Sequence, residues 1–128
     1  MGSWKLLVVD DDPDIRRIAA LSLGRIGGFQ VRLASCAEEA LAEVGRERPD
    51  LVLLDVSMPG TDGPGTLAAI RALPGSDQLP VVFFTATSNE VEVARLRALG
   101  AIGVVPKPFE VAELPKRIHA ILAELGLE

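Results

Sequence analysis

Four short hydrophobic runs in this chain are each followed by a polar side chain that could take part in phosphoryl chemistry. The runs are Leu-Leu-Val-Val, Leu-Val-Leu-Leu, Val-Val-Phe-Phe and Val-Val-Pro, and the residues that follow them are Asp10 with Asp11, Asp55, Thr85 and Lys107. If the runs are parallel strands of one α/β sheet, their carboxyl ends lie along one edge, where such sheets bind ligands. Carboxylates, a hydroxyl and an ammonium would then meet at that edge.

Three carboxylates at one edge imply a cation. Like charges this close repel one another and raise at least one pKa unless a positive charge lies between them. The donors are hard oxygens, with one histidine in the whole chain and no thiolate beside them, which favours Mg²⁺, or Mn²⁺, over Zn²⁺. The pattern therefore predicts a metal site that involves Asp10, Asp11 and Asp55.

The other polar residues acquire roles once a metal is bound. A carboxylate can attack a phosphoryl group and form an aspartyl phosphate. The metal and the Lys107 ammonium would neutralise charge on the phosphoryl oxygens, which is where most catalysis of phosphoryl transfer lies. The Thr85 hydroxyl could donate a hydrogen bond to another of these oxygens. A lysine or threonine alone at a strand end is usually a solvated or turn residue, but four such coincidences favour a shared site.

The hydrophobic runs have the length and composition of buried strands. Short continuous apolar segments are typical of strands that are covered on both faces. Five strands are expected, at about 5–10, 29–34, 51–55, 80–85 and 102–105.

The segments between these runs have helical character. Asp12 and Pro13 are typical of an N-cap and a first turn, with Gly27 and Gly28 as the stop. Ser35 with Glu38 forms a capping-box pattern for a second helix. Three more helices are expected, from Pro64 to before Pro74, from about Ser88 to Leu99 with Gly100 as the C-terminal glycine, and over roughly 111–125. Pro115 should make the last helix start late or bend.

This alternation predicts the fold class. Strands and helices that alternate with short connections imply right-handed crossovers and a mostly parallel sheet with helices on both faces. We therefore expect an α/β protein with a single doubly wound (βα)5 domain over residues 1–128, of which 1–3 are a disordered or expression-derived start. A length of 128 residues, 48% of them hydrophobic, suits one domain with one core.

Composition narrows the class of function. A net charge of −5 repels nucleic acid phosphates, so direct nucleic acid binding is not expected. The single Cys36 excludes an internal disulfide and suits a reducing compartment. No apolar stretch approaches the ~20 residues that span a bilayer, and no signal-peptide core follows Met1. A cytoplasmic protein without membrane contact is expected.

The order and spacing of four motifs resemble the receiver domain of two-component response regulators, including receivers of the chemotaxis type. The motifs run from Lys5 to Ile15, from Leu54 to Gly63, from Phe84 to Ala86 and from Lys107 to Phe109, so the resemblance spans essentially the whole chain. It implies a flavodoxin-like sheet with strand order 2-1-3-4-5. It also implies a signalling protein that assists only its own phosphorylation and dephosphorylation, and not a turnover enzyme.

The resemblance assigns the metal and the phosphoryl group to particular residues. Asp55 would be the phosphoacceptor, with a sensor histidine kinase or a histidine phosphotransfer protein as the donor. Asp11, Asp55 and the backbone carbonyl of Ser57 would ligate Mg²⁺ directly. Asp10 would act through water.

The resemblance also implies a switch. Lys107 would pair with Asp55 before phosphorylation and with the phosphoryl group after it, and the Thr85 hydroxyl would move in to bind that group. The Lys107-Pro108 peptide bond is expected to be cis. The downstream partner would be an effector protein or a fused output domain, and the fourth helix, fifth strand and fifth helix would form a candidate homodimer face.

At one position the sequence departs from the receiver pattern, and at two others the resemblance implies an effect on the chemistry. Val104 stands where receivers usually carry Tyr or Phe, so the usual coupling to the surface of the fourth helix, fifth strand and fifth helix is in question. The resemblance implies that Ser57 and Thr87 occupy the positions that tune the approach of hydrolytic water. Neither is a carboxylate or an amide, so a long-lived phosphoryl group is expected.

Three other classes of protein stay in consideration. A pseudo-receiver would use the same fold as an unphosphorylated docking platform, which the absence of the aromatic residue at Val104 favours. A haloacid-dehalogenase-type phosphohydrolase would begin with an Asp-x-Asp pattern such as Asp10 and Asp12, but it needs a hydroxyl where Asp14 stands. A flavin-binding module would meet repulsion between Asp-Asp-Asp-Pro-Asp and the flavin phosphate.

Overall fold

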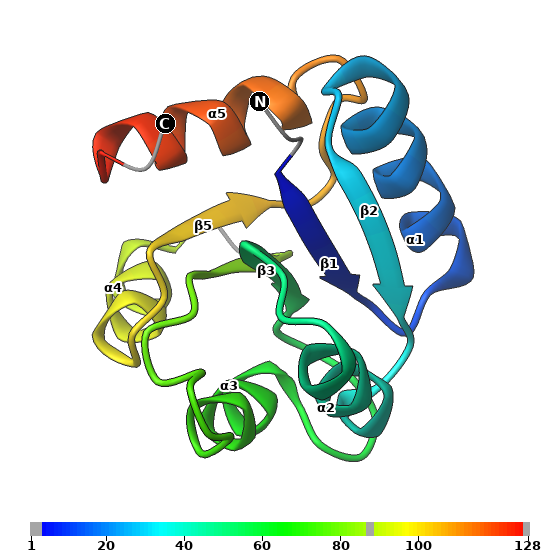
Figure 1. The fold of residues 1–128 in the computed structure, drawn as a ribbon. Helices are drawn as coiled ribbons and strands as arrows, with labels where there is room; N and C mark the ends of the chain where they lie inside the picture. The colour runs from blue at the N-terminus through cyan, green and yellow to red at the C-terminus, as the bar shows by residue number, and fades with distance from the viewer. Residues whose placement is uncertain (1–3, 87–88, 127–128) are drawn as a thin grey trace.

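The computed structural model describes residues 4–86 and 89–126 (Figure 1). Over these residues five strands alternate with five α-helices, as the sequence predicts. The strands are β1 (Lys5–Val9), β2 (Gln30–Ala34), β3 (Leu51–Asp55), β4 (Val81–Thr85) and β5 (Gly103–Pro106). The helices are α1 (Pro13–Ala20), the π-helix η1 (Leu21–Ile26), α2 (Ala37–Arg46), α3 (Gly63–Arg71), α4 (Glu90–Ala98) and α5 (Leu114–Glu124).

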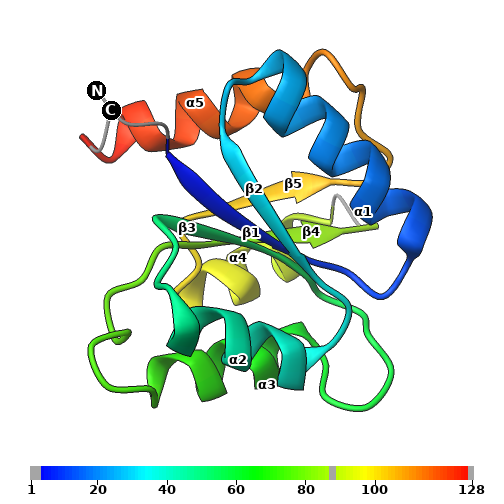
Figure 2. The ribbon, with the colours of Figure 1, turned by 45° about the vertical axis from the view of Figure 1, so that its right-hand side comes forward.

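All five strands lie in one parallel sheet of order β2-β1-β3-β4-β5, which confirms the predicted topology. Helices α1 and α5 cover one face of the sheet, and α2, α3 and α4 cover the other (Figure 2). The strand order reverses between β1 and β3, so the chain leaves the sheet on opposite sides there. The doubly wound α/β fold with helices on both faces is confirmed.

The hydrophobic runs form strands because both of their faces are buried. Along β1, Leu7 and Val9 belong to the core beneath α2, α3 and α4, whereas Leu6 and Val8 belong to the core beneath α1 and α5. Each of these four side chains is fully buried. A central parallel strand therefore has no polar face, and this is why the sequence shows continuous runs and no alternation.

The first helix differs from the expectation of a single α-helix that runs to Gly27. Asp12 caps it as predicted, since its carboxylate accepts a hydrogen bond from the backbone N–H of Asp14 at 2.8 Å. After Ala20 the chain continues as the π-helix η1 and not as an α-helix. Within η1 the buried Ser22 hydroxyl donates to the carbonyl of Val111 at 2.5 Å, which connects this helix to the segment before α5.

The predicted capping box of the second helix is wrong by one residue. Helix α2 has Cys36 at its N-cap, so the third helical position is Glu39 and not Glu38. The Glu39 carboxylate accepts hydrogen bonds from both the backbone N–H and the hydroxyl of Ser35, at 2.7 and 2.6 Å. The acid still reaches back across the first turn, but from the position that the true helix start dictates.

The last two helices begin where local hydrogen bonding allows. Asn89 caps α4, since its side chain accepts from the backbone N–H of Val91 at 2.8 Å, while the expected start at Ser88 lies outside the described residues. Helix α5 begins at Leu114, which places Pro115 in the first turn, where a missing N–H costs nothing. The prediction that Pro115 makes this helix start late is confirmed.

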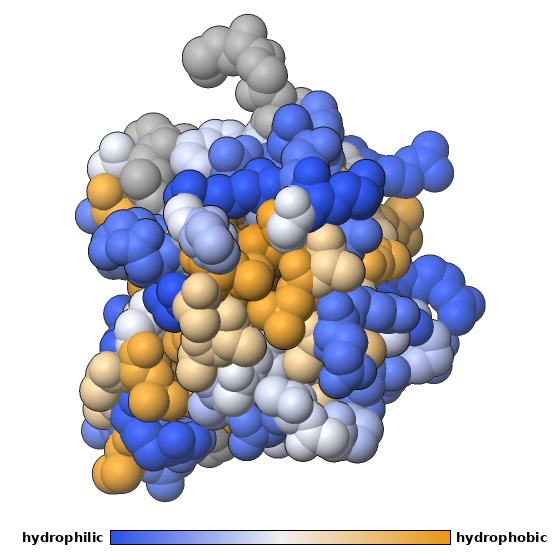
Figure 3. Space-filling view, turned by 60° about the horizontal axis from the view of Figure 1, so that its bottom comes forward, coloured by the Kyte–Doolittle hydropathy of each residue, from blue (hydrophilic) through white to orange (hydrophobic). Residues whose placement is uncertain are grey.

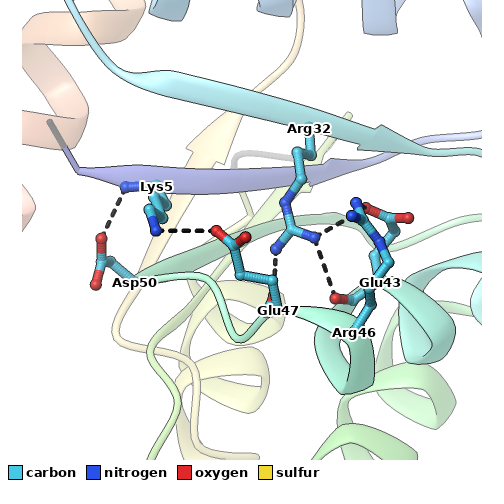
Figure 4. Close-up of polar contacts among 6 residues, drawn as sticks. All are labelled: Lys5, Arg32, Glu43, Arg46, Glu47 and Asp50. Atoms are coloured by element: carbon cyan, nitrogen blue, oxygen red, sulfur yellow. Dashed lines mark hydrogen bonds and ion pairs between the residues drawn. The ribbon is translucent and has the colours of Figure 1, made fainter.

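Ion pairs join the edge of the sheet to the end of α2 (Figure 4). Arg32 on β2 binds Glu43 at 2.9 Å and also donates to the carbonyl of Glu47. Lys5 on β1 binds the Glu47 carboxylate at 2.9 Å, and its backbone N–H donates to Asp50 at 2.7 Å. Partly exposed pairs of this kind are worth about 0–1 kcal/mol each. Their main effect is to fix how α2 lies against β1 and β2.

The helices present mixed surfaces to solvent. Seen from below the view of Figure 1, apolar side chains gather near the middle of the molecule and polar side chains border them (Figure 3).

Two glycines near the end of β3 serve different purposes. Gly60 has a φ of 78°, a left-handed conformation that favours glycine, as expected for a turn. Gly63 does not have a positive φ. A Cβ at Gly63 would instead lie 2.7 Å from Cα of Val56 and would clash with the carbonyl oxygen of Asp55. Gly63 is required because α3 begins against the backbone of Asp55.

We predict that Gly63→Ala destabilises the protein by about 1–3 kcal/mol, because the added methyl group has no space and must displace the backbone after β3. Gly45→Ala is the matched control, since Gly45 is exposed within α2 and an added Cβ would meet nothing within 4 Å. The control should stabilise the protein by about 1 kcal/mol, because alanine favours helices over glycine. Urea unfolding of both variants tests this, and equal midpoints would contradict the close-approach argument.

Candidate functional site

The predicted polar residues meet at the carboxyl end of the sheet. They line a cavity of about 250 Å³ beside the point where the strand order reverses. The lining residues are Asp10, Asp11, Asp12, Asp55, Ser57, Thr85, Ala86 and Lys107. The ends of β1, β3, β4 and β5 therefore bring together side chains that lie up to 97 positions apart in the sequence.

Three acids in the cavity lie close enough together to form a metal site. One carboxylate oxygen from each of Asp10, Asp11 and Asp55 lies within 4.8 Å of the others. Asp10 and Asp55 are buried, whereas Asp11 is exposed. Oxygen donors at this spacing fit Mg²⁺ or Mn²⁺. The backbone of Ser57 lies beside them, since its N–H contacts Asp55 Oδ1 at 3.4 Å.

Asp10 is held at all four of its polar atoms. Its backbone N–H donates to the carbonyl of Ala34 at 3.1 Å, and its own carbonyl accepts from Arg16 at 2.7 Å. Its carboxylate accepts from the backbone N–H of Asp12 at 2.9 Å and from Lys107 Nζ at 2.7 Å. Because protein donors engage both carboxylate oxygens, this geometry suits a residue that reaches a metal through water.

Lys107 forms an ion pair with two acids. Its Nζ lies 3.1 Å from Asp55 Oδ1, and it lies closer to Asp10, at 2.7 Å. The side chains of Lys107, Asp55 and Asp10 are only 19%, 7% and 1% exposed, so water screens these contacts weakly. The contact with Asp55 agrees with the expectation, whereas the shorter contact with Asp10 was not anticipated from the sequence.

Burial and charge shift the titration of this pair. Burial raises the pKa of Asp55, the hydrogen bond from Lys107 opposes the shift, and the nearby Asp10 carboxylate adds to it. Burial alone lowers the pKa of Lys107, but hydrogen bonds to Asp10 and Asp55 outweigh that effect and leave the pKa raised. Lys107 is therefore cationic at neutral pH. Keeping Asp55 ionised in the folded protein costs free energy.

Thr85 and the peptide after Lys107 complete the rim. Thr85 ends β4 and is buried, and its carbonyl accepts a hydrogen bond from the backbone N–H of Lys107 at 2.7 Å. The strands β4 and β5 thus present Thr85 and Lys107 to the same cavity. The Lys107-Pro108 peptide bond is cis, as expected.

Two tuning positions lie away from the cavity or outside the described chain. Val104 is partly buried and packs against the apolar core beneath α2, α3 and α4, and it does not line the cavity. Thr87 lies outside the described residues. Their effects on switching and on phosphoryl lifetime stay predictions.

Arg16 is a contact residue that the sequence reasoning missed. Its guanidinium donates to a backbone carbonyl, that of Asp10, and its charge also helps to lower the pKa of Glu39. Sequence patterns reveal charge pairs by residue type, and a carbonyl acceptor leaves no such signal. The spacing of six residues between Asp10 and an arginine in the first turns of α1 is the only trace of it.

Comparison with known proteins places the chain in a family. The sequence model of the response regulator receiver domain matches residues 6–119. The chain is 40% identical over 128 residues to the transcriptional regulatory protein PrrA of Mycobacterium leprae, which covers 98% of the chain and 53% of that protein. It is 42% identical over 119 residues to the response regulator MprA of the same organism, covering 92% of the chain and 50% of that protein.

Solved structures agree with the sequence matches. The chemotaxis response regulator CheY4 of Vibrio cholerae superposes with a TM-score of 0.88 at 30% identity, covering 94% of this chain and 100% of that one. The fold and the sequence matches define a receiver domain of the two-component signalling class. The chain belongs to the response regulator receiver domain family.

The similarity to the curated relatives extends over only part of their length. The chain spans about half the length of the curated relatives it matches. Over residues 4–86 and 89–126, none of the helices has the length and apolar character needed to cross a membrane.

We predict that Asp55→Asn stabilises the metal-free protein at pH 7, by on the order of 1 kcal/mol. The folded state holds a proton on Asp55 more tightly than the unfolded state does, because burial raises its pKa. Stability therefore falls as pH rises from the usual aspartate range of about 4 through that raised pKa. Asparagine removes this loss.

Urea unfolding of wild type and Asp55→Asn at a series of pH values, with chelator present, measures the effect. The advantage of the variant should shrink as pH falls through the raised pKa of Asp55. A variant that is less stable than wild type at pH 7 would contradict the assignment.

We predict that Lys107→Met destabilises the metal-free protein by about 3 kcal/mol, because it leaves the buried carboxylates of Asp10 and Asp55 without their cation. The double variant Asp10→Asn, Lys107→Met should recover part of the loss, since one of the two charges is removed. Lys116→Met is the control, because Lys116 is 73% exposed and pairs with Glu113 at 3.6 Å. Equal thermal unfolding of the Lys107 and Lys116 variants would argue against the pair.

Proposed function

We propose that this domain accepts a phosphoryl group on Asp55 from the phosphohistidine of a sensor histidine kinase or a histidine phosphotransfer protein. The observation that carries the proposal is the meeting of Asp10, Asp11, Asp55 and Lys107 in one cavity. An acid cluster alone would suit many roles. A cluster in which two buried acids are paired with a partly buried lysine suits transfer of an anionic group.

In the proposed reaction a carboxylate oxygen of Asp55 attacks the phosphorus of the donor. The new bond joins that oxygen to phosphorus, the bond from phosphorus to the donor imidazole nitrogen breaks, and the imidazole leaves with the electron pair of that bond. Asp11, Asp55 and the carbonyl of Ser57 would hold Mg²⁺, with Asp10 acting through water. The ion, when bound, neutralises charge on the phosphoryl oxygens.

Lys107 is suited to follow the phosphoryl group. Its 2.7 Å contact with Asp10 would keep the ammonium in the cavity when Asp55 is no longer an anionic partner. Lys107 can then pair with a phosphoryl oxygen, and the Thr85 hydroxyl can bind another. Because Val104 offers no aromatic ring, the conformational change on phosphorylation would reach the surface of α4, β5 and α5 through Thr85 and the segment that follows it.

The proposal extends to the fate of the phosphoryl group. Ser57 and Thr87 carry no carboxylate or amide with which to position water, so we propose slow autodephosphorylation and no substrate turnover. The signal would pass to an effector protein or to a fused output domain, as the half-length match to transcriptional regulators suggests. We propose a cytoplasmic domain that binds no nucleic acid itself and forms a homodimer through α4, β5 and α5.

We predict that the protein gains the mass of one phosphoryl group when treated with a small phosphoramidate or acyl phosphate and Mg²⁺. The gain should disappear in Asp55→Asn and fall strongly when Mg²⁺ is chelated. Asp14→Asn is the control, because Asp14 is exposed, lies outside the cavity and pairs with Arg17 at 3.6 Å. Intact-mass spectrometry with a peptide map measures the label and its position.

This measurement, with an assay for phosphate released from an ester, distinguishes the proposed function from a pseudo-receiver and from a phosphohydrolase. A folded wild-type protein that takes up no phosphoryl group would support a pseudo-receiver that acts by docking alone. Release of phosphate from an ester over many cycles would instead indicate a phosphohydrolase.

A further inference from the structure

Arg16 contacts the backbone beside the exposed acid Asp11. Its guanidinium donates to the carbonyl of Asp10 at 2.7 Å, whereas its backbone N–H makes the ordinary first-turn helix hydrogen bond to the carbonyl of Asp12 at 3.1 Å. Only the guanidinium contact depends on the Arg16 side chain. It restrains the peptide that precedes Asp11, and with it the direction in which the Asp11 carboxylate points.

The carbonyl of Asp10 is the more informative of the two acceptors. It belongs to the peptide that joins Asp10 to Asp11, so fixing it fixes the rotation of that peptide. The other polar atoms of Asp10 are held by Ala34, Asp12 and Lys107. Arg16 thus supplies the remaining contact, and it supplies it to the atom nearest Asp11.

Arg17 offers a contrast within the same turn. It is 76% exposed and pairs with Asp14 at 3.6 Å, whereas the contact of Arg16 with Asp10 is partly buried. The two arginines carry the same charge at adjacent positions of α1, so they differ mainly in their hydrogen-bond and ion-pair partners.

We propose that Arg16 is a positioning residue for the metal ligand Asp11. It holds the peptide between Asp10 and Asp11 so that the Asp11 carboxylate already faces the cavity before a cation arrives. This inference rests on the proposed function for the metal site, but it concerns a residue that the proposed function does not use.

Loss of the Arg16 charge and loss of its positioning contact predict opposite changes in Mg²⁺ affinity. The inference can therefore be tested. Removing a positive charge near a cation site strengthens cation binding by Coulomb attraction alone. Removing a contact that orients a metal ligand weakens it, typically by 10-fold or more. Loss of Arg16 should therefore weaken Mg²⁺ binding even though the cavity becomes more negative.

The experiment is a calorimetric Mg²⁺ titration of wild type, Arg16→Met and Arg17→Met. Arg16→Met should bind Mg²⁺ on the order of 10-fold more weakly, and Arg17→Met should bind it as tightly as wild type or slightly more tightly. Amide exchange without metal gives a second readout. The backbone N–H of Asp12, which donates to Asp10, should exchange faster in Arg16→Met and not in Arg17→Met.

Mg²⁺ affinity in Arg16→Met equal to or tighter than in wild type would overturn the inference. Should this variant fail to fold, Arg16→Lys is measured against the same criterion, because an ammonium lacks the planar fork of the guanidinium. Absence of Mg²⁺ binding in wild type would instead remove the proposed function. The two failures are therefore distinguishable.

Discussion

The ion pair of Lys107 with Asp10 and Asp55 is the interaction on which the site depends. Two buried carboxylates this close cannot both stay ionised at low cost unless a cation lies between them. The residues lie 97 and 52 positions away from Lys107 in sequence, so the pair exists only because the sheet places the ends of β1, β3 and β5 at one edge. The strand order and register therefore place the Lys107 ammonium beside both carboxylates.

The geometry of this pair also explains how a small chemical change could alter the domain. Lys107 is shared between an acid that is fully engaged by the protein and an acid that faces the cavity. Neutralising or modifying Asp55 removes one partner and leaves the contact with Asp10 in place. The ammonium can then bind a new anion without leaving the cavity. Such a rearrangement is confined to the carboxyl ends of the strands.

The strands and the meeting of the acids could be predicted because both follow from local patterns. Buried parallel strands require continuous apolar runs, and a strand that ends places its next residue at the sheet edge. Contacts that depend on the exact first residue of a helix or on a backbone acceptor could not be predicted from the sequence. The capping-box pattern points to Glu38 only if the N-cap is Ser35, one residue before the actual N-cap Cys36, and the π-helical turn around Ser22 has no known sequence period. Gly63 and Arg16 both act on backbone atoms, which carry no residue signature.

The most direct test of the central claim is to locate a divalent ion in crystals grown with Mn²⁺, using its anomalous scattering. We predict one ion between the carboxylates of Asp11 and Asp55, next to the Ser57 carbonyl, with Asp10 still bound to Lys107. An intact cavity without an ion at saturating Mn²⁺, or an ion held elsewhere on the surface, would contradict it.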